Sequence, residues 1–455
     1  MSRPAAPTVL GIDQGLSGAR TAVMDAGGRV LGRGRADCRD IDRSGGEMVH
    51  DPAGWVAEMT AAARAALADA GATSVDAIAI GALGPAPVLL DRDLQPLAAT
   101  PISSMGPVAP RLAAWRRERP ELFEQVAWVV DVTGVLVSTL VGRPVMDAIT
   151  ADDHVAIGDP IASTPTPQEA LTMAGGLTRG AAGRLGLGVG TPVAVGTYDT
   201  FVDLAGIGVR EVGDAGLVLG STLNIGVICS SAEAPEGLRA SRHVGSGWFV
   251  GGWTSAAGRA LDWCLGLFPE AERAGIEKAA GQLMPGAGGL LSFPHLEGER
   301  APVWDPLARG AVLGLTTATT PEQIYRSMVD SVALAAADLA RRMRDLRIVD
   351  RPWCVTGGGV RNDTWLRATA DAIGEPLEVL DLPDAAGAAR FALRALGVDV
   401  PAHESRIVEP DAERHGRAGE LLDIGDGLYA GIAERMHRLG AMDRRASEQA
   451  SGIRT

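Results

Sequence analysis

The chain has 455 residues, of which 46% are hydrophobic and 22% charged, and this length predicts two or three globular domains. The formal net charge of −14 argues against binding to nucleic acid or to an anionic membrane surface, although a local loop can still bind phosphate. The four cysteines show no metal-binding spacing, and we find neither a signal-peptide pattern nor an apolar run of about 18 residues, so we expect a cytoplasmic protein without a zinc site or a membrane span.

The N-terminal part of the sequence predicts three antiparallel strands, a helix and a buried strand. The strands are expected at 9–13, 20–25, 30–35 and 75–83. Asp51 and Pro52 are typical of a helix start, apolar residues follow at helical spacing, and Gly71 is typical of a helix end.

A similar order of elements returns in the second half of the sequence. Strands are expected at 217–219, 224–229, 249–252, 353–356 and 377–380, and helices at 254–268, from Pro321 to 343, at 362–373 and at 384–396. Each half begins with a strand, a glycine turn and a second strand. We therefore predict an α/β protein with two mixed domains, at 1–210 and 211–443, followed by a polar tail at 444–455. Two unrelated mixed domains are the alternative.

The first motif with possible chemistry is the hairpin Gly11–Gly18. An apolar strand delivers Asp13 to a turn that contains Gly15 and Ser17, where backbone N–H groups can face phosphate oxygens. A carboxylate at this place can hold Mg²⁺ through water. A plain glycine hairpin with a solvated aspartate explains the same residues equally well.

The second motif is Gly196–Asp199, which follows a buried strand at 193–195. Ala205 and Gly206 after it suit a closely packed helix. A carboxylate at this position can accept the proton of a substrate hydroxyl. Taken alone, the motif is also typical of an aspartate that caps a helix.

Two further glycine turns have the character of nucleotide-binding loops. The turn Gly220, Ser221, Thr222 joins two strands and offers small residues and hydroxyl groups. The run Gly357, Gly358, Gly359 joins a strand to a helix that Asn362 is expected to cap, and its missing side chains leave room for a base or a ribose. The run is not a Walker A loop, because no Lys-Ser or Lys-Thr pair follows it. Simple connections are the alternative for both.

The remaining candidates have weaker patterns. The charged segment 293–310 is interpreted as a structural clasp, and a part of the binding cleft is the alternative. Isolated histidines such as His50 and His295 are interpreted as surface or structural residues, and Trp253 as core or cleft wall.

Taken in order, these motifs resemble those of the FGGY carbohydrate kinases, the family of glycerol, xylulose, ribulose and gluconate kinases. The resemblance runs from about Val9 to about Gly397. Its most specific part is Glu299–Pro302 with Asp305–Gly310, which is similar to the family's Gly-Glu-Arg-x-Pro and Asp-Pro-x-Ala-Arg-Gly run.

The resemblance implies two ribonuclease-H-like (actin-like ATPase) domains with a cleft between them, which bind ATP, Mg²⁺ and a small carbohydrate. It implies Asp199 as general base and Asp13 near the metal and the transferred phosphoryl group. The implied cofactor-binding residues are Gly15, Ser17, Gly220, Ser221, Thr222, Gly357, Gly358, Gly359 and Asn362. The resemblance leaves a homodimer open.

The sequence departs from the family where the sugar should bind. Leu16 replaces a hydroxyl residue of the first loop, although Ser17 can serve. Segment 83–87 offers no side-chain hydrogen bonds, and segment 102–106 lacks both charged residues of the pattern that relatives often show there. Pro85, Met105, Asp199 and Trp253 are the expected substrate contacts. The thin substrate motifs therefore keep a second hypothesis open, a non-catalytic or regulatory nucleotide-binding relative, whereas an actin-like structural ATPase finds less support.

Overall fold

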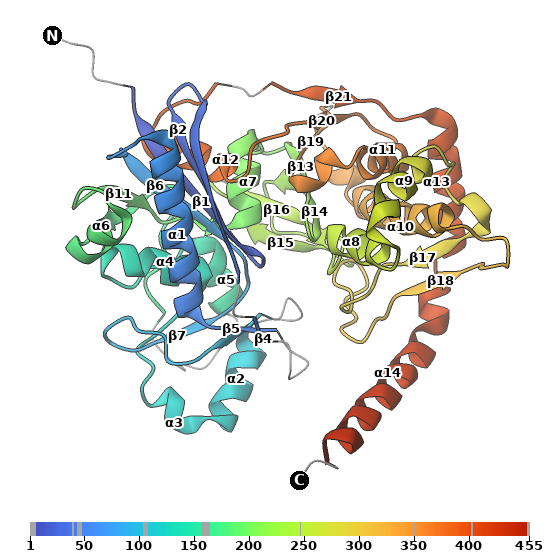
Figure 1. Cartoon of the computed structure of the whole chain (residues 1–455), viewed down its shortest axis with the longest axis horizontal. Helices are drawn as coiled ribbons and strands as arrows, with labels where there is room; N and C mark the ends of the chain where they lie inside the picture. The colour runs from blue at the N-terminus through green and yellow to red at the C-terminus, as the bar shows by residue number, and fades with distance from the viewer. Residues whose placement is uncertain are drawn as a thin grey trace. The chain divides into compact units, whose positions relative to one another are not determined.

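The computed structural model describes residues 6–38, 41–42, 48–102, 108–155, 164–245, 247–349, 351–401 and 404–452. The chain separates into two compact units (Figure 1). Unit 1 consists of Met1–Glu211, Ser241–Trp248 and Leu382–Glu404, and unit 2 consists of Val212–Ala240, Phe249–Asp381 and Ser405–Thr455. Among the described residues, no helix combines the length and the apolar character needed to cross a lipid bilayer.

Within the described residues, unit 1 is built on one seven-stranded sheet. Its strand order is β10 (Met173–Gly176), β11 (Pro192–Ala194), β6 (Ala77–Ala82), β1 (Thr8–Gly15), β2 (Gly18–Asp25) and β3 (Val30–Asp37), and β12 (Thr197–Tyr198) also pairs with β6. The three predicted antiparallel strands are confirmed as β1, β2 and β3, because β2 pairs antiparallel with both of its neighbours. Strands β6 and β1 are parallel.

Helices cover both faces of this sheet. On one face, α1 (Pro52–Ala70) buries Trp55 and Met59 against Leu10 and Ile12 of β1. The predicted ends of α1 are confirmed, since Asp51 caps its first turn and Gly71 ends it in a left-handed conformation. Further helices on this core are α4 (Val132–Val141) and α6 (Arg179–Leu185).

The opposite face of the sheet carries α7 (Asp199–Ile207) and α12 (Ala386–Ala395). Gly11 of β1 permits this packing, because a Cβ atom there would lie 2.0 Å from the backbone nitrogen of Ala389. Figure 1 shows α12, in orange-red, beside the blue strands β1 and β2. Residues 382–404 therefore belong to unit 1, although they follow much of unit 2 in the chain. The domain limits 1–210 and 211–443 stay a prediction.

Smaller elements complete unit 1. They are β4 (Ile41–Asp42), β5 (Val49–His50) and β8 (Thr100–Pro101) in one small sheet, β7 (Val88–Leu90) with β9 (Trp128–Val130), and α2 (Val108–Glu118), α3 (Pro120–Phe123) and α5 (Ala148–Val155).

The described residues of unit 2 also form a seven-stranded sheet. Its order is β15 (Arg239–Arg242), β16 (Trp248–Trp253), β14 (Leu223–Cys229), β13 (Ala215–Leu219), β19 (Trp353–Thr356), β20 (Leu377–Val379) and β21 (Arg406–Val408). The helices are α8 (Gly258–Gly266), α9 (Glu270–Ala280), α10 (Pro321–Arg342), α11 (Asp363–Ile373), α13 (Ala412–Gly425) and α14 (Leu428–Gly452), and a hairpin consists of β17 (Leu291–Phe293) and β18 (Ala311–Leu313).

The core of unit 2 forms between the sheet and the helices α8, α10 and α11, around Tyr325, Trp353 and Trp365. The predicted strand at 353–356 and the helix start at Pro321 are confirmed. The helix expected at 254–268 is shorter and begins at Gly258, because the backbone nitrogens of Ala257 and Gly258 donate to the preceding turn instead.

Candidate functional site

Asp13 and Asp199 lie at the same end of the sheet of unit 1. Asp13 pairs with Gly81 of β6 on one side, and Thr197 of β12 pairs with Gly81 on the other. Asp199 follows Thr197 by two residues and opens α7. Adjacent strands lie about 4.8 Å apart, so the backbones of β1 and β12 are separated by about 10 Å. A Cβ atom on Gly81 would lie 3.2 Å from the Cα atom of Asp199, so this glycine admits the start of α7.

Three more charged side chains join this pair within unit 1. Arg20 of β2 lies opposite Asp13, with 3.6 Å between its Nη1 and the Asp13 Oδ2, and its Nε lies 3.6 Å from Asp384 Oδ2. Burial, and then the charge of Asp199, raise the pKa of Asp13 to about 7 against the opposing effect of Arg20. Burial and the charges of Asp13 and Asp199 likewise raise the pKa of Asp203 well above its usual value. The cluster therefore holds an excess of carboxylates.

The close approach of α7 and α12 brings Asp203 and Asp384 into the cluster. A Cβ atom on Gly206 of α7 would lie 2.7 Å from the Cα atom of Gly387, and one on Gly387 would lie 2.2 Å from Asp203 Oδ1. Asp384 lies just before α12. The two glycines therefore set the spacing that gathers these carboxylates.

The first predicted phosphate loop is a two-residue turn between β1 and β2. Gly15 pairs with Gly18, and Ser17 is exposed between them. The Ser17 hydroxyl accepts a hydrogen bond from Arg20 Nη2 at 2.8 Å. Gly18 has a φ of +121°, and a Cβ atom there would clash with the carbonyl oxygen of Ala36 at 2.1 Å. Gly18 is thus required by packing, whereas Gly15 and Ser17 keep their expected position at the turn.

The predicted sugar segment contacts the residue before Asp199. A Cβ atom on Gly84 would lie 2.1 Å from the Tyr198 ring, so Gly84 lies against that ring. The carbonyl oxygen of Pro85 accepts a hydrogen bond from Arg111 Nη2 at 3.1 Å. Met105, another expected substrate contact, lies outside the described residues. The predicted sugar segment thus contacts, at Gly84, the residue that precedes Asp199.

In unit 2, the turn Gly220–Thr222 joins β13 to β14 as predicted. Its carbonyl groups accept hydrogen bonds from the start of α8, with Gly258 N donating to Gly220 O at 3.0 Å and Ala257 N to Ser221 O at 2.9 Å. Thr222 Oγ1 accepts a hydrogen bond from Asn224 at 3.2 Å. Hydrogen bonds from the start of α8 and from Asn224 therefore fix the conformation of the turn.

Glycine stands at the three successive positions of this loop for different physical reasons. Gly357 has a φ of +99°, and a Cβ atom there would lie 2.5 Å from the carbonyl oxygen of Leu219. A Cβ atom on Gly359 would lie 2.2 Å from the Trp365 ring, whereas one on Gly358 would meet nothing within 4 Å. Packing within unit 2 requires the outer two glycines, and the exposed Gly358 leaves its surface open to a ligand.

Asn362 caps α11, as predicted, because its Oδ1 accepts a hydrogen bond from Trp365 N at 2.9 Å. Its Nδ2 donates to Glu277 Oε1 at 2.5 Å and to Tyr325 Oη at 3.1 Å. Both amide hydrogens are thus used inside unit 2. Asn362 holds the end of the glycine loop in place.

Trp253 and the segment 293–310 also lie in unit 2. The half-buried ring of Trp253 packs edge-on against Trp304, with 6.0 Å between the ring centroids. Buried Glu299 accepts hydrogen bonds from Ser255 N at 2.7 Å and from Arg300 N at 2.8 Å, and it pairs with His295. These contacts support the structural-clasp interpretation of the segment.

Sequence reasoning missed Arg20, Asp203 and Asp384. The register of the first hairpin could have found Arg20, because counting back from the turn pairs it with Asp13. The spacing of Asp199 and Asp203, four residues apart on one helix, places both on one face and was also readable. Asp384 has no local signal, because only tertiary packing places α12 beside the strands of unit 1.

Curated relatives share part of their length with this chain. A ribulokinase of Shouchella clausii is 27% identical over 363 residues, which are 71% of this chain and 65% of the relative. A gluconokinase of Bacillus licheniformis is 28% identical over 206 residues, or 42% of this chain and 40% of the relative. The matched part therefore covers less than two thirds of either relative.

Solved structures and family models extend these similarities. A xylulose kinase from Rhodospirillum rubrum superposes with a TM-score of 0.78 at 23% identity, over 94% of this chain and all of that one, and so establishes the shared fold. The N-terminal and C-terminal domain models of the FGGY family of carbohydrate kinases match residues 8–140 and 219–396. Members of this family have two actin-like ATPase domains, in agreement with the two sheet-based units. The chain belongs to the FGGY family of carbohydrate kinases.

Proposed function

We propose that this chain transfers the γ-phosphoryl group of ATP to a hydroxyl group of a small carbohydrate, which is a ketose, a polyol or a sugar acid. One observation carries the proposal. Asp13 and Thr197 flank the same glycine of β6, so that Asp13 and Asp199 lie at one end of one sheet. Family membership and the kinase names of the relatives support this reaction class.

In this proposal, Asp199 is the general base. It accepts the proton of the attacking hydroxyl as that oxygen forms its bond to the γ-phosphorus and the bond to the β,γ-bridging oxygen breaks, releasing ADP. The position of Asp199 in the first turn of α7 supports the role, because the positive end of the helix attracts a carboxylate and holds it in place. A hydrogen bond of 2.6 Å from Thr200 N to Oδ1 holds the carboxylate in place.

Asp13 is the proposed ligand, directly or through water, of Mg²⁺. The donor set fits this ion, because hard oxygen donors are what Mg²⁺ prefers. Repulsion from Asp199 contributes to the pKa of about 7 at Asp13, and a bound cation would relieve this repulsion. When bound, the ion supplies charge neutralisation at the phosphates.

For ATP, we propose contacts in each unit by itself, from the two glycine loops in unit 2 and from the first hairpin turn in unit 1. The phosphate contacts would come from Gly15, Ser17, and the turn Gly220, Ser221, Thr222. The adenosine contacts would come from Gly357, Gly358 and Gly359, and Asn362 would act by fixing the start of α11. The open surface of Gly358 supports the nucleotide assignment.

For the carbohydrate, we propose contacts with Pro85, Trp253 and Asp199, and with Met105 outside the described residues. The segment around Pro85 offers backbone groups in place of polar side chains, so it suits a substrate that differs from those of relatives with charged sugar-binding residues. A cytoplasmic location and a homodimer remain predictions.

The test is turnover by the Asp199→Asn variant, measured as ADP release with a panel of ketoses, polyols and aldonates. Loss of a general base should lower kcat by about 10²- to 10⁴-fold while ATP binding stays within a few-fold. Asp384→Asn is the matched control, because it removes the same charge from the same cluster without removing the base. Equal losses in both variants would reduce Asp199 to an electrostatic role, and full turnover in Asp199→Asn would remove it from the mechanism.

The panel also decides between the kinase and its alternative. ADP release that depends on one carbohydrate supports the kinase. Saturable ATP binding with no carbohydrate-dependent turnover across the panel would favour a non-catalytic or regulatory nucleotide-binding relative.

A further inference from the structure

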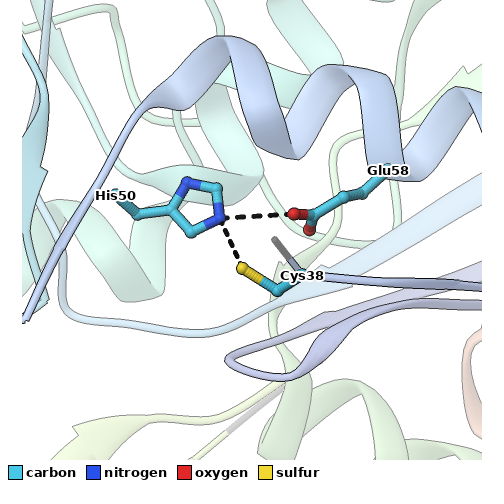
Figure 2. A group of neighbouring side chains, drawn as sticks. All are labelled: Cys38, His50 and Glu58. Carbon is cyan, nitrogen blue, oxygen red and sulfur yellow. Dashed lines mark hydrogen bonds and ion pairs between the residues drawn. The ribbon is translucent and has the colours of Figure 1, made fainter. Parts of the chain in front are cut away.

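A second cluster of reactive side chains lies on the other face of the unit 1 sheet. It consists of Cys38, which follows β3, His50 of β5 and Glu58 of α1 (Figure 2). Their nearest ligand atoms all lie within 4.8 Å of one another. His50 is 1% exposed and Glu58 7%, whereas Cys38 is half-buried. The proposed kinase reaction uses none of these three residues.

The hydrogen bonds of His50 determine which ring nitrogen faces the cluster. Nδ1 lies 2.7 Å from the carbonyl oxygen of Asp51, and a carbonyl oxygen can only accept. Nδ1 therefore carries the hydrogen, and in the neutral ring Nε2 presents a lone pair. Figure 2 shows Nε2 directed at both partners, with Cys38 Sγ at 3.0 Å and Glu58 Oε1 at 3.3 Å. A backbone carbonyl that fixes the tautomer in this way is typical of metal-bound histidine.

Burial alone would raise the pKa of Glu58, but hydrogen bonds with His50, Gln14 and Cys38 lower it, so the cluster favours the ionised carboxylate. Its Oε1 lies 3.3 Å from His50 Nε2, and in the neutral ring this nitrogen has no hydrogen to donate, so two lone pairs would face each other. Such an arrangement costs free energy unless a proton or a cation lies between the two atoms. The space between Oε1 and Nε2 therefore favours a positive charge, which a proton or a metal ion can supply.

The surroundings of the cluster already orient its members. Gln14 of β1 is fully buried, and its Nε2 donates to Glu58 Oε2 at 2.8 Å, while its own Oε1 is buried without a partner. Trp55 stacks on the His50 ring with 4.7 Å between centroids. Supporting contacts of this kind hold ligands in position before an ion binds. The site thus has a formed outer shell as well as three donors.

Two of the three distances between donor atoms lie near those expected around a small tetrahedral ion. Bond lengths of about 2.0 Å to nitrogen and oxygen and about 2.3 Å to sulfur give a separation of about 3.3 Å between N and O, and about 3.5 Å between S and N. The first value equals the observed 3.3 Å, and the second requires Cys38 Sγ to move about 0.5 Å from its 3.0 Å position. One thiolate, one imidazole and one carboxylate are a donor set that suits Zn²⁺.

We propose that Cys38, His50 and Glu58 bind one Zn²⁺ ion, with a fourth position left for water or for Gln14 Oε1. On binding, the Cys38 thiol loses its proton to solvent and its sulfur forms the bond to the metal. The site lies on the α1 face of the sheet, whereas Asp13 and Asp199 lie on the side of α7 and α12. Its occupancy is therefore separate from that of the proposed Mg²⁺ site.

The test is metal binding by the untagged, metal-free full chain. Titration with Zn²⁺ should give one tight equivalent per chain, and Co²⁺ in its place should give a thiolate-to-cobalt charge-transfer absorption. Cys38→Ser and Glu58→Gln should each weaken Zn²⁺ binding by at least about 100-fold, and Gln14→Met by about 10- to 100-fold. Circular dichroism and cooperative melting establish that each variant is folded.

Cys229→Ser is the matched control, because it removes another half-buried thiol, in unit 2, and should leave Zn²⁺ affinity unchanged. Absence of a stoichiometric Zn²⁺ site in the folded chain would overturn the proposal and would make the cluster a proton-linked triad. Binding that survives in Cys38→Ser, or a cobalt complex without the charge-transfer band, would also overturn it.

Discussion

Asp13→Asn should stabilise the metal-free protein at alkaline pH, because the wild-type carboxylate ionises against Asp199 and against burial. The pKa of Asp13 is raised from 3.8 to about 7. Each pKa unit corresponds to about 1.4 kcal/mol, so ionised Asp13 lowers the free energy of unfolding by about 4 kcal/mol at pH values above 7. The pKa of about 7 already includes the attraction of Arg20, and asparagine resembles the protonated carboxyl group, so the expected net gain is about 4 kcal/mol.

The pH dependence follows from the direction of the shift. Between about pH 4 and pH 7 the folded state holds a proton at Asp13 that the unfolded state has lost, so the wild-type free energy of unfolding falls as the pH rises. The variant lacks this group. Its advantage should therefore be absent near pH 4 and complete near pH 8.

The assay is urea unfolding with a metal chelator present, at about pH 5 and about pH 8. Asp384→Asn is the control, because its carboxylate is 49% exposed and water screens much of its repulsion, so its gain should be smaller. A variant at position 13 that is no more stable than wild type near pH 8, or equally stabilised at both pH values, would refute the electrostatic account of the cluster.

Two further predictions concern packing. Asn362→Ala should lower the free energy of unfolding by about 1–3 kcal/mol, since it removes the cap of α11 and the amide that donates to the buried Tyr325 hydroxyl. Urea unfolding measures this loss, and an unchanged midpoint would contradict the prediction. Gly206→Ala should also lower the free energy of unfolding by about 1–3 kcal/mol, because its Cβ would lie 2.7 Å from Gly387. Gly183→Ala, in α6 with open space around it, should instead raise this free energy by up to about 1 kcal/mol. Thermal melting of both variants separates the effect of packing from that of helix propensity.

Local patterns predicted those elements whose ends are set by their own residues. Asp51 with Pro52 and Gly71 mark α1, and Pro321 marks α10, because caps act within one helical turn. The start of α8 at Gly258 was not readable in the same way. There the turn Gly220–Thr222, which is distant in the chain, takes up the backbone N–H groups that the helix would have used.

The packing of distant segments against one another was harder to predict from the sequence than the local elements. Residues 382–404 join unit 1 because Gly11 and Gly206 let α12 pack at backbone distance, and a single sequence does not tell which of many glycines serve such approaches. The same limit applies to Cys38 and His50, which are 12 residues apart. Their spacing matches no metal-binding pattern, and the small sheet of β5 brings them together.

The alternation of side chains along β1 links the proposed reaction to the proposed zinc site. Gln14 points to the α1 face and contacts Glu58, whereas Asp13 points to the opposite face. The backbone nitrogen of Cys38 donates a hydrogen bond to the carbonyl oxygen of Ser17 at 3.0 Å. The cluster therefore contacts the first hairpin at two places, at Gln14 through Glu58 and at Ser17 through Cys38. An ion bound by Cys38 and Glu58 would therefore restrain both arms of the first hairpin. The restraint acts on backbone position, because the side chains of the two sites lie on different faces of the sheet.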